Sequence, residues 1–253
     1  MGYGDDLLIT SFAAQLKKQF PERQIVIGNV AKRQAFHSII YENNPNIADC
    51  NKLDSKKPIH IIDYHTGNRP YIDYNKSNNK KYIWNKKFKV KPGEIYFSDS
   101  EKLKAKKIID DAIKFWKSKN KHSFKAIIFF EPSSTKIDTR QFGTKQLNKD
   151  WGINNWKELA LKLQKNYLLI QSMHAKSKII EGIYASENLN FRCACAVLNE
   201  CDFYVGLEGG FVQAAGALKK NGVIYYGGWI DPKIIGYDFH VNIYYENSKS
   251  PCG

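Results

Sequence analysis

The sequence predicts an α/β protein whose two halves each carry parallel strands covered by helices and face each other across a cleft. Short β-branched runs alternate with amphipathic segments along most of the chain, which is typical of right-handed βαβ units. The alternation starts a second time near residue 122, where the charge of the chain also changes. We therefore expect one domain over residues 1–122 and a second over residues 123–253.

The elements of the first half begin with a helix after the turn at Gly4, because Leu8, Phe12, Leu16 and Phe20 recur every four residues. The other elements expected in this half are strands at 23–30, 58–65 and 94–98, a polar surface excursion at 68–93, and a helix from a cap at Ser100 to Ser118, with Leu103 on its apolar face.

The second half repeats the alternation of strands and helices. We expect strands within 124–136 and at 166–172, 202–206 and 222–226, an extended segment at 178–184, and helices at 154–165, 191–201 and 211–218. Ligands of open α/β sheets bind in the crevice beyond the carboxyl ends of the strands, so a cleft between the two halves is the expected site.

The composition is that of a globular protein, because 253 residues with 43% hydrophobic side chains can build sizeable cores. No run approaches the roughly 20 apolar residues of a membrane span, and the N-terminus lacks a secretory pattern, so we expect a cytoplasmic protein. The five cysteines are odd in number and lack CxxC spacing, which predicts neither a disulfide framework nor a zinc site.

The net charge of +14 belongs mainly to the first half. Residues 1–125 carry 25 Lys and Arg against 13 Asp and Glu, a net +12, whereas residues 126–253 carry 14 against 12, a net +2. A field of one sign attracts anionic partners such as a phosphorylated glycan, a lipid headgroup surface or nucleic acid. An AT-rich genome would also enrich lysine and asparagine without selection for binding, and this alternative stays open.

A glycine turn at 208–210 is the first candidate site. Glu208, Gly209 and Gly210 separate an expected strand from an expected helix, and the unpaired N–H groups and dipole of a helix N-terminus suit a phosphate or another anion. A plain tight turn has the same pattern. Glu208 favours contact with a hydroxyl or a ribose over a free phosphate.

A polar loop at 133–136 is the second candidate. Ser133, Ser134 and Thr135 offer hydroxyl donors, and Lys136 supplies a point charge suited to a diphosphate, although an exposed loop of no function fits the pattern equally well. The sequence contains no P-loop, no GxGxxG, no Asp-x-Asp pair and no HExxH, so we expect a metal-independent site without a cofactor.

Taken in order, several segments resemble the heptosyltransferase family, glycosyltransferase family 9 of the GT-B class with two Rossmann-like domains. The resemblance lies in "GYGDDLLITSFAAQLKKQFP", in "FEPSSTKIDTRQFGTKQLNKDWGINNWKELALKL", in "FRCACAVLNECDFYVGLEGGFVQAAGALKKNGVIYYGG" and in "DPKIIGYDFHVNIY". It covers most of the chain in the family's order.

The resemblance implies a role for each matching residue. It implies that Asp5 is the general base that deprotonates the acceptor hydroxyl, with Asp6 as the alternative. The remaining residues are implied to bind the donor nucleotide sugar: Gly4, Ser133, Ser134, Thr135, Lys136, Glu208, Gly209, Gly210, Phe211 and Gln213.

The sequence departs from the family at three places. Glu208 stands where the family usually has Asp, and Gln213 where it usually has His. The family's first strand precedes the Gly-Asp turn, and Met1 leaves no room for it. Relatives also run on into further helix beyond the final "SPCG".

These observations together predict a metal-independent inverting glycosyltransferase that uses a nucleotide-diphosphate sugar and a surface-glycan or lipopolysaccharide-type acceptor. The implied partners are the donor and an anionic or lipid-linked glycan, with a peripheral contact at the inner face of the membrane through the basic half; nucleic acid, supported by charge alone, is not expected. A noncatalytic nucleotide-sugar or glycan binding protein of the same fold is the alternative.

Overall fold

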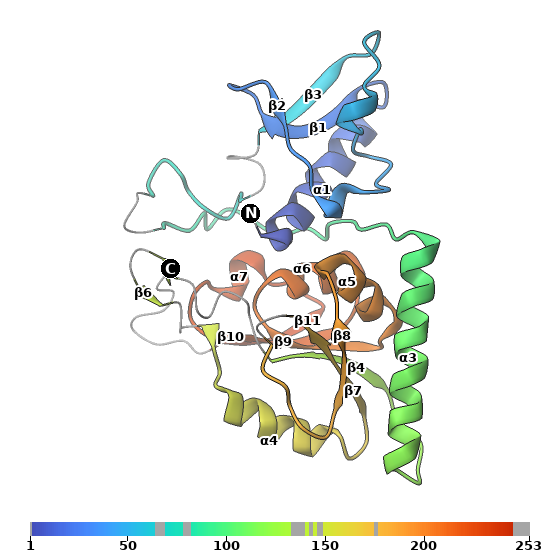
Figure 1. Ribbon diagram of the computed structural model, residues 1–253. Coiled ribbons are helices and arrows are strands. Elements are labelled where there is room, and N and C mark those ends of the chain that lie inside the picture. The colour runs from blue at the N-terminus through green and yellow to red at the C-terminus, as the bar shows by residue number, and fades with distance from the viewer. Residues whose placement is uncertain are drawn as a thin grey trace.

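The computed structural model describes residues 2–63, 69–77, 82–132, 140–141, 144–145, 149–174 and 177–244. Its larger sheet has six strands, and every neighbouring pair is parallel (Figure 1). The strands lie in the order β11 (His240–Tyr244), β10 (Gly222–Tyr226), β9 (Phe203–Leu207), β4 (Ile127–Glu131), β7 (Leu168–Met173) and β8 (Tyr184–Asn188). The chain proceeds outward from β4 to β8 on one side and from β9 to β11 on the other, so the strand order reverses between β4 and β9.

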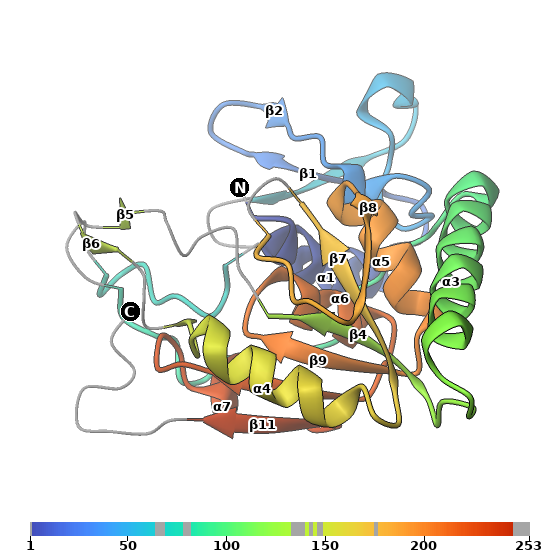
Figure 2. The same ribbon diagram turned by 60° about the horizontal axis from the view of Figure 1, so that its bottom comes forward.

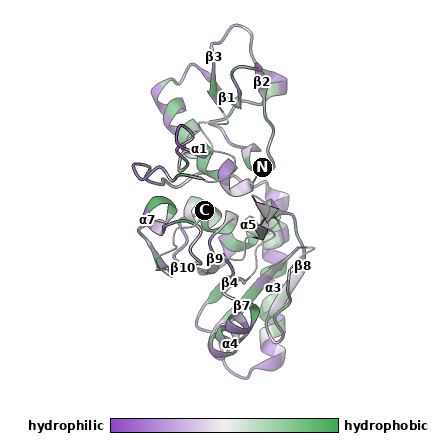
Figure 3. Ribbon diagram, turned by 90° about the vertical axis from the view of Figure 1, so that its left-hand side faces the viewer, coloured by the Kyte–Doolittle hydropathy of each residue, from purple (hydrophilic) through white to green (hydrophobic). Residues whose placement is uncertain are grey.

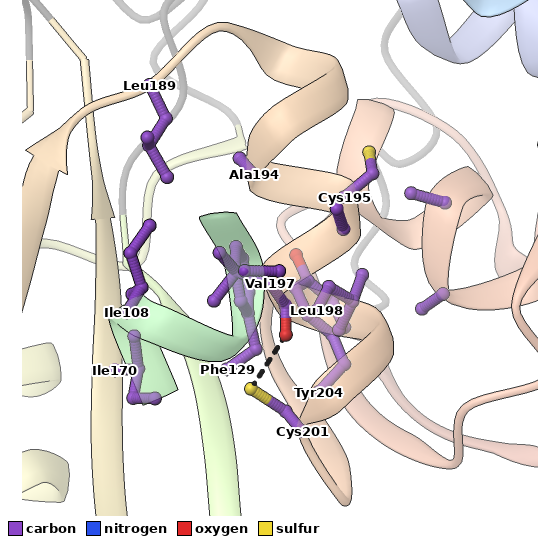
Figure 4. Packing of buried hydrophobic residues seen from close by; sticks show 14 of the residues in the cluster. Ile108, Phe129, Ile170, Leu189, Ala194, Cys195, Val197, Leu198, Cys201 and Tyr204 are labelled. Atoms are coloured by element: carbon purple, nitrogen blue, oxygen red, sulfur yellow. Dashed lines mark hydrogen bonds between the residues drawn. The ribbon is translucent and has the colours of Figure 1, made fainter. Parts of the chain in front are cut away.

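Helices cover both faces of this sheet. The three on one face are α3 (Asp99–Lys119), α5 (Phe191–Glu200) and α6 (Gly210–Ala217), and α4 (Ile153–Leu163) lies on the other (Figure 2). Successive side chains of β4 point to opposite faces of the sheet. Phe129 packs against α5, whereas the ring of Phe130 meets the ring of Trp156 in α4 edge-on, with 5.6 Å between the ring centroids. Figure 4 shows the first packing, where Cys201 at the end of α5 donates its Sγ–H to the Val197 carbonyl at 3.3 Å.

The smaller sheet has three strands, β2 (Gln34–Ala35), β1 (Gln24–Asn29) and β3 (Ile59–Asp63), of which β1 and β3 are parallel and β2 is antiparallel. The helix α1 (Tyr3–Gln19) packs on it through one apolar face, and its other side contacts α6, so α1 lies between the two sheets (Figure 3). The parallel α/β architecture predicted from the sequence is therefore confirmed.

The remaining elements are short. They are two 3₁₀ turns, Ile39–Tyr41 and Cys50–Lys52, the two-residue pair β5 (Arg140–Gln141) and β6 (Thr144–Lys145), and the helix α7 (Pro232–Ile235). None of the helices in the described part of the chain is long and apolar enough to cross a membrane.

The segment before α3 differs most from its prediction. Residues 94–98 form no strand, because they cross α1 instead of a sheet edge: Gly93 lies against the Leu7 carbonyl, and the Glu94 N–H donates to the Thr10 Oγ1 at 2.7 Å. The excursion at 68–93 is not simply a surface loop. Within its described residues, Ile72 and Trp84 pair through an isolated bridge and pack into the larger part of the protein.

The structure corrects three further details. Helix α3 is capped by Ser98 in a capping box with Glu101, rather than by Ser100, and Leu103 on this helix is 71% exposed. Strand β8 begins at Tyr184, where the extended segment was expected to end. The sequence analysis did not predict α7 and β11.

Helix α3 precedes the boundary expected at residue 122, yet it packs on α5 and on the edge of the larger sheet. The division of the chain at that residue stays a prediction.

A buried arginine joins α5 to three other segments. Arg192 is 2% exposed and donates from Nε to the Oε1 of Glu101 in α3 at 2.5 Å. Its remaining N–H groups donate to the carbonyls of Ile39, Glu42 and Tyr96. The guanidinium thereby links three segments to α5 on the larger sheet. They are the 3₁₀ turn Ile39–Tyr41, the stretch 94–98 that crosses α1, and α3.

Replacing Arg192 by Ala should lower the free energy of unfolding by about 3–5 kcal/mol, because Glu101 would stay largely buried without its cation and three carbonyls would lose their donor. Urea unfolding measures the change. Lys104→Ala is the control, because the ion pair of Lys104 with Glu187 is solvent-exposed and should contribute less than about 1 kcal/mol. Equal effects of the two substitutions would contradict this role of Arg192.

Candidate functional site

A pocket of about 480 Å³ lies where the N-terminus of α1 meets the larger sheet. Its lining includes the N-terminus of α1, residues within 69–72 and 82–84, the turn 208–210 and the loop that leads to α7. The ends of β4 and β9 reach it through Glu131 and Leu207. The pocket therefore lies at the carboxyl ends of the two strands between which the strand order reverses, where open α/β sheets bind ligands.

Two glycines bring the N-termini of α1 and α6 together in this pocket. A Cβ on Gly4 would lie 2.9 Å from the Cα of Gly210, and a Cβ on Gly210 would lie 3.1 Å from the ring of Phe191. A side chain at Gly4 would therefore push α1 away from α6, whereas one at Gly210 would press on the Phe191 ring. The contact places the first turn of α1 beside the residues that begin α6.

Asp5 lies in the first turn of α1 and faces the pocket. Its Oδ1 accepts from the Tyr71 hydroxyl at 2.5 Å, and its Oδ2 accepts from the Arg69 Nε at 3.0 Å. Burial and the adjacent carboxylate raise the pKa of Tyr71 well above its usual value, so the hydroxyl keeps its proton. Burial opposes the charge of Arg69, but Asp5 outweighs it and raises the pKa of the guanidinium. Asp5 is thus a fixed carboxylate with a permanent cation beside it.

Asp6 does not line the pocket. Its carboxylate accepts from the Ser38 hydroxyl at 2.7 Å and from the Tyr41 hydroxyl at 3.3 Å, on the side of the 3₁₀ turn. Burial raises its pKa. Asp6 holds this turn against α1, so the geometry gives it no access to a ligand in the pocket.

Glu208 is the first residue of the turn between β9 and α6, and it is 2% exposed. Neither of its carboxylate oxygens has a hydrogen-bond partner among the residues that the structure describes. Burial raises its pKa to about 7, while the charge of Lys149 and the nearby amides of Gly227 and Trp229 oppose this rise without making hydrogen bonds of good geometry. A buried acceptor of this kind is satisfied by a ligand that donates hydrogen bonds.

The N-terminus of α6 lines the pocket next to Glu208. Gly209, Gly210 and Phe211 contribute to the wall, and no side chain in the described part of the chain caps the helix. Its first N–H groups can therefore donate to an anion. Gln213 lies one turn further on, where its Oε1 accepts from the Tyr237 hydroxyl at 2.6 Å.

The predicted phosphate loop, Ser133 to Lys136, lies outside the described residues. The lysine that the structure brings into the pocket is Lys149, whose Nζ lies 5.0 Å from the centroid of the Trp229 ring. Two residues later, Trp151 stacks on Tyr225 at 5.5 Å and anchors this part of the chain to the sheet. Lys149 could have been found from the sequence only through its position two residues before Trp151.

Three further residues of the pocket were not predicted from the sequence: Arg69 and Tyr71, which lie inside the expected surface excursion, and Glu131, the last residue of β4. Three histidines lie at or near strand ends expected from the sequence, namely His65, His174 and His240, and a structural role is the sequence-based expectation for each. His65 lies outside the described residues, His174 lines the pocket, and the Nε2 of His240 bonds to the Lys220 carbonyl at 3.0 Å. No group of three or more metal-ligating side chains occurs in the part of the chain that the structure describes.

No protein-family model matches the sequence, and no curated protein is significantly similar to it. Solved structures share its fold. The chain matches a glycosyltransferase family 9 protein from Veillonella parvula with a TM-score of 0.59 and 12% identity, over 98% of this chain and 84% of that one. It matches the dodecameric, iron-containing glycosyltransferase TibC of enterotoxigenic E. coli with a TM-score of 0.55 and 15% identity, over 100% of this chain and 62% of that one.

These matches confirm, at the level of the fold, the resemblance to glycosyltransferase family 9 seen in the sequence. The similarity extends over nearly the whole chain and includes both sheets. It shows that this α/β chain shares the fold of these two glycosyltransferases.

The ionisation of Glu208 should make stability depend on pH. The carboxyl group has a usual pKa of 4.5 and a folded pKa of about 7, so the folded state loses stability relative to the unfolded chain as pH rises from about 4.5 to 7. Glu208→Gln cannot ionise, so its free energy of unfolding should rise relative to wild type by about 3 kcal/mol across this range. Urea unfolding at a series of pH values measures the difference.

Glu187→Gln, at an exposed side chain, is the control for loss of a negative charge. A difference between Glu208→Gln and wild type that does not change with pH would contradict the burial of an ionisable Glu208.

Proposed function

We propose that the protein is a metal-independent inverting glycosyltransferase that moves a sugar from a nucleotide-diphosphate donor to a glycan acceptor. In this proposal the two sheets belong to two Rossmann-like domains, 1–122 and 123–253, that face each other across the pocket. The observation that carries the proposal is the contact of Gly4 with Gly210, which places the Asp5 carboxylate beside an uncapped helix N-terminus and Lys149 in one pocket. The shared fold with family 9 glycosyltransferases supports it.

The chemistry requires groups of opposite charge on the two sides of the sugar. Asp5 accepts the proton of the acceptor hydroxyl as its oxygen attacks the anomeric carbon. The bond from that carbon to the diphosphate oxygen breaks, and the electron pair leaves with the diphosphate. Lys149 and the N–H groups of Gly210 and Phe211 stabilise the departing charge, and a single displacement inverts the anomeric configuration.

Donor binding in this proposal uses the residues around the turn 208–210. Glu208, whose oxygens have no hydrogen-bond partner among the described residues, accepts hydrogen bonds from hydroxyl groups of the donor, and Gln213 lines the same pocket. The loop of Ser133, Ser134, Thr135 and Lys136 remains a predicted second contact with the diphosphate. Lys149 joins this set because it lines the same pocket.

The acceptor side belongs to the basic half of the chain. Arg69 lies beside Asp5, and residues 1–125 carry a net +12, both of which favour an anionic acceptor. We assign a surface-glycan or lipopolysaccharide-type acceptor, reached by peripheral contact at the inner face of the membrane.

One observation favours a second candidate, a noncatalytic nucleotide-sugar binding protein. Both oxygens of Asp5 already accept hydrogen bonds, from Arg69 and from Tyr71, so an acceptor hydroxyl would compete with these two donors for the carboxylate. Binding without transfer would follow if these two contacts persist when the acceptor is present.

Thermal unfolding with ADP, UDP, GDP and CMP tests the donor site. One nucleotide should stabilise the wild-type protein by about 2.7 kcal/mol at 100 times its dissociation constant, with EDTA present. Lys149→Ala should lose most of this stabilisation. Lys162→Ala is the matched control, because Lys162 is exposed and pairs with Glu158 outside the pocket. No stabilisation by any nucleotide would overturn the donor site.

Asp5→Asn separates the two candidates. The substitution should abolish transfer of labelled sugar to a membrane extract, because the amide cannot accept the proton, while nucleotide affinity changes less than about threefold. Wild-type nucleotide binding without transfer to any acceptor would favour the binding protein. Transfer that is unchanged in the Asn variant would remove Asp5 as the base.

A further inference from the structure

The order of the strands divides the pocket into two sides. The end of β7 borders it through Ser172 and His174 on one side of the turn at 208–210. The loop after β10 borders it through Trp229 on the other side, because β10 and β7 flank β9 and β4 in opposite directions. A ligand that crosses the turn therefore meets different surfaces at its two ends.

The β10 side of the pocket carries four aromatic side chains, which we call the aromatic wall: Tyr71, Tyr82, Trp84 and Trp229. The ring centroids of Trp84 and Trp229 lie 5.6 Å apart, those of Tyr82 and Trp229 lie 6.2 Å apart, and those of Tyr71 and Trp84 lie 6.3 Å apart. The rings form one connected surface rather than isolated contacts.

The aromatic wall runs between the two charged groups that the proposed reaction uses. At one end the Tyr71 hydroxyl donates to Asp5, and at the other the Lys149 Nζ lies over the Trp229 ring. An apolar cluster supports the aromatic wall. In this cluster Ile72 and Trp84 pack with Ile230, which lies in the loop before α7. The wall is thus a preformed surface between base and cation.

We propose that the aromatic wall is the subsite for the transferred sugar, with Trp229 as the ring on which the sugar stacks. The proposal rests on the proposed function, since the reacting sugar must lie between the base and the leaving diphosphate. A sugar ring has a face of C–H groups and a rim of hydroxyls. The negative face of an indole attracts the C–H groups.

Glu208 supplies the complementary polar contact. It is buried in the same pocket, neither of its oxygens has a hydrogen-bond partner among the described residues, and hydroxyl groups at the rim of a sugar would donate to them. A purely apolar ligand on the aromatic wall would leave this carboxylate unsatisfied. A nucleobase would occupy the β7 side, since the diphosphate at α6 lies between the base and the sugar of a nucleotide sugar.

The test compares affinity for a nucleotide with affinity for its sugar conjugate. Calorimetry on the full chain would use ADP with ADP-heptose, UDP with UDP-glucose, GDP with GDP-mannose, and CMP with CMP-sialic acid. Trp229→Ala should weaken binding of the conjugate by about tenfold and Trp229→Phe by about threefold, while affinity for the nucleotide alone changes less than about twofold. Trp116→Phe is the matched control, because Trp116 packs against His122 and Phe124 outside the pocket and should change neither affinity.

Intrinsic fluorescence gives a second measurement that does not depend on stability. The conjugate should change the indole emission of wild type more than the nucleotide does, and this excess should vanish in Trp229→Phe. An equal loss of affinity for nucleotide and conjugate in the Trp229 variants would make this residue part of the nucleotide site and overturn the proposal. No loss for either would also overturn it. If wild type binds none of the nucleotides, the proposed function fails as well.

Discussion

The close approach of α1 and α6 is the constraint on which the pocket depends. A Cβ on Gly4 would lie 2.9 Å from the Cα of Gly210 and would push the helices apart, so the two backbones meet here with no side chain between them. Without this contact Asp5 would belong to the small sheet and Glu208 to the large one, with no pocket in common. Both helices also point their N-termini at the same space, where their dipoles favour negative charge.

Two other ties hold the halves in the orientation that this contact needs. Arg192 in α5 donates hydrogen bonds to the carbonyls of Ile39 and Tyr96. The apolar cluster of Ile72 and Ile230 joins the segment before α3 to the loop before α7. These ties differ in character, because buried hydrogen bonds to a charge are directional, whereas apolar packing tolerates small displacements.

Periodicity predicted the large sheet well and the region before α3 poorly. The strand at 222–226 has the bounds expected from its β-branched run, because a buried parallel strand needs little besides apolar side chains. Residues 94–98 have the same local pattern but meet a helix instead of a strand edge, and local sequence does not encode that neighbour. Asp5 and Glu208 could be found from glycine turns. Arg69 and Tyr71 could not, since a polar segment becomes a site only when the fold carries it to Asp5.

The helix contact also shapes how the protein folds. Gly4 and Gly210 are 206 positions apart, and the sheet between them is built almost entirely from crossover connections. Contacts of such long range form late, after the loops between them have closed. During synthesis, α1 emerges long before α6 exists, with the apolar face meant for the small sheet already complete and the opposite face still without its partner. The pocket needs residues from both ends of this span, so its lining is complete only when α6 and the loop that leads to α7 have been synthesised.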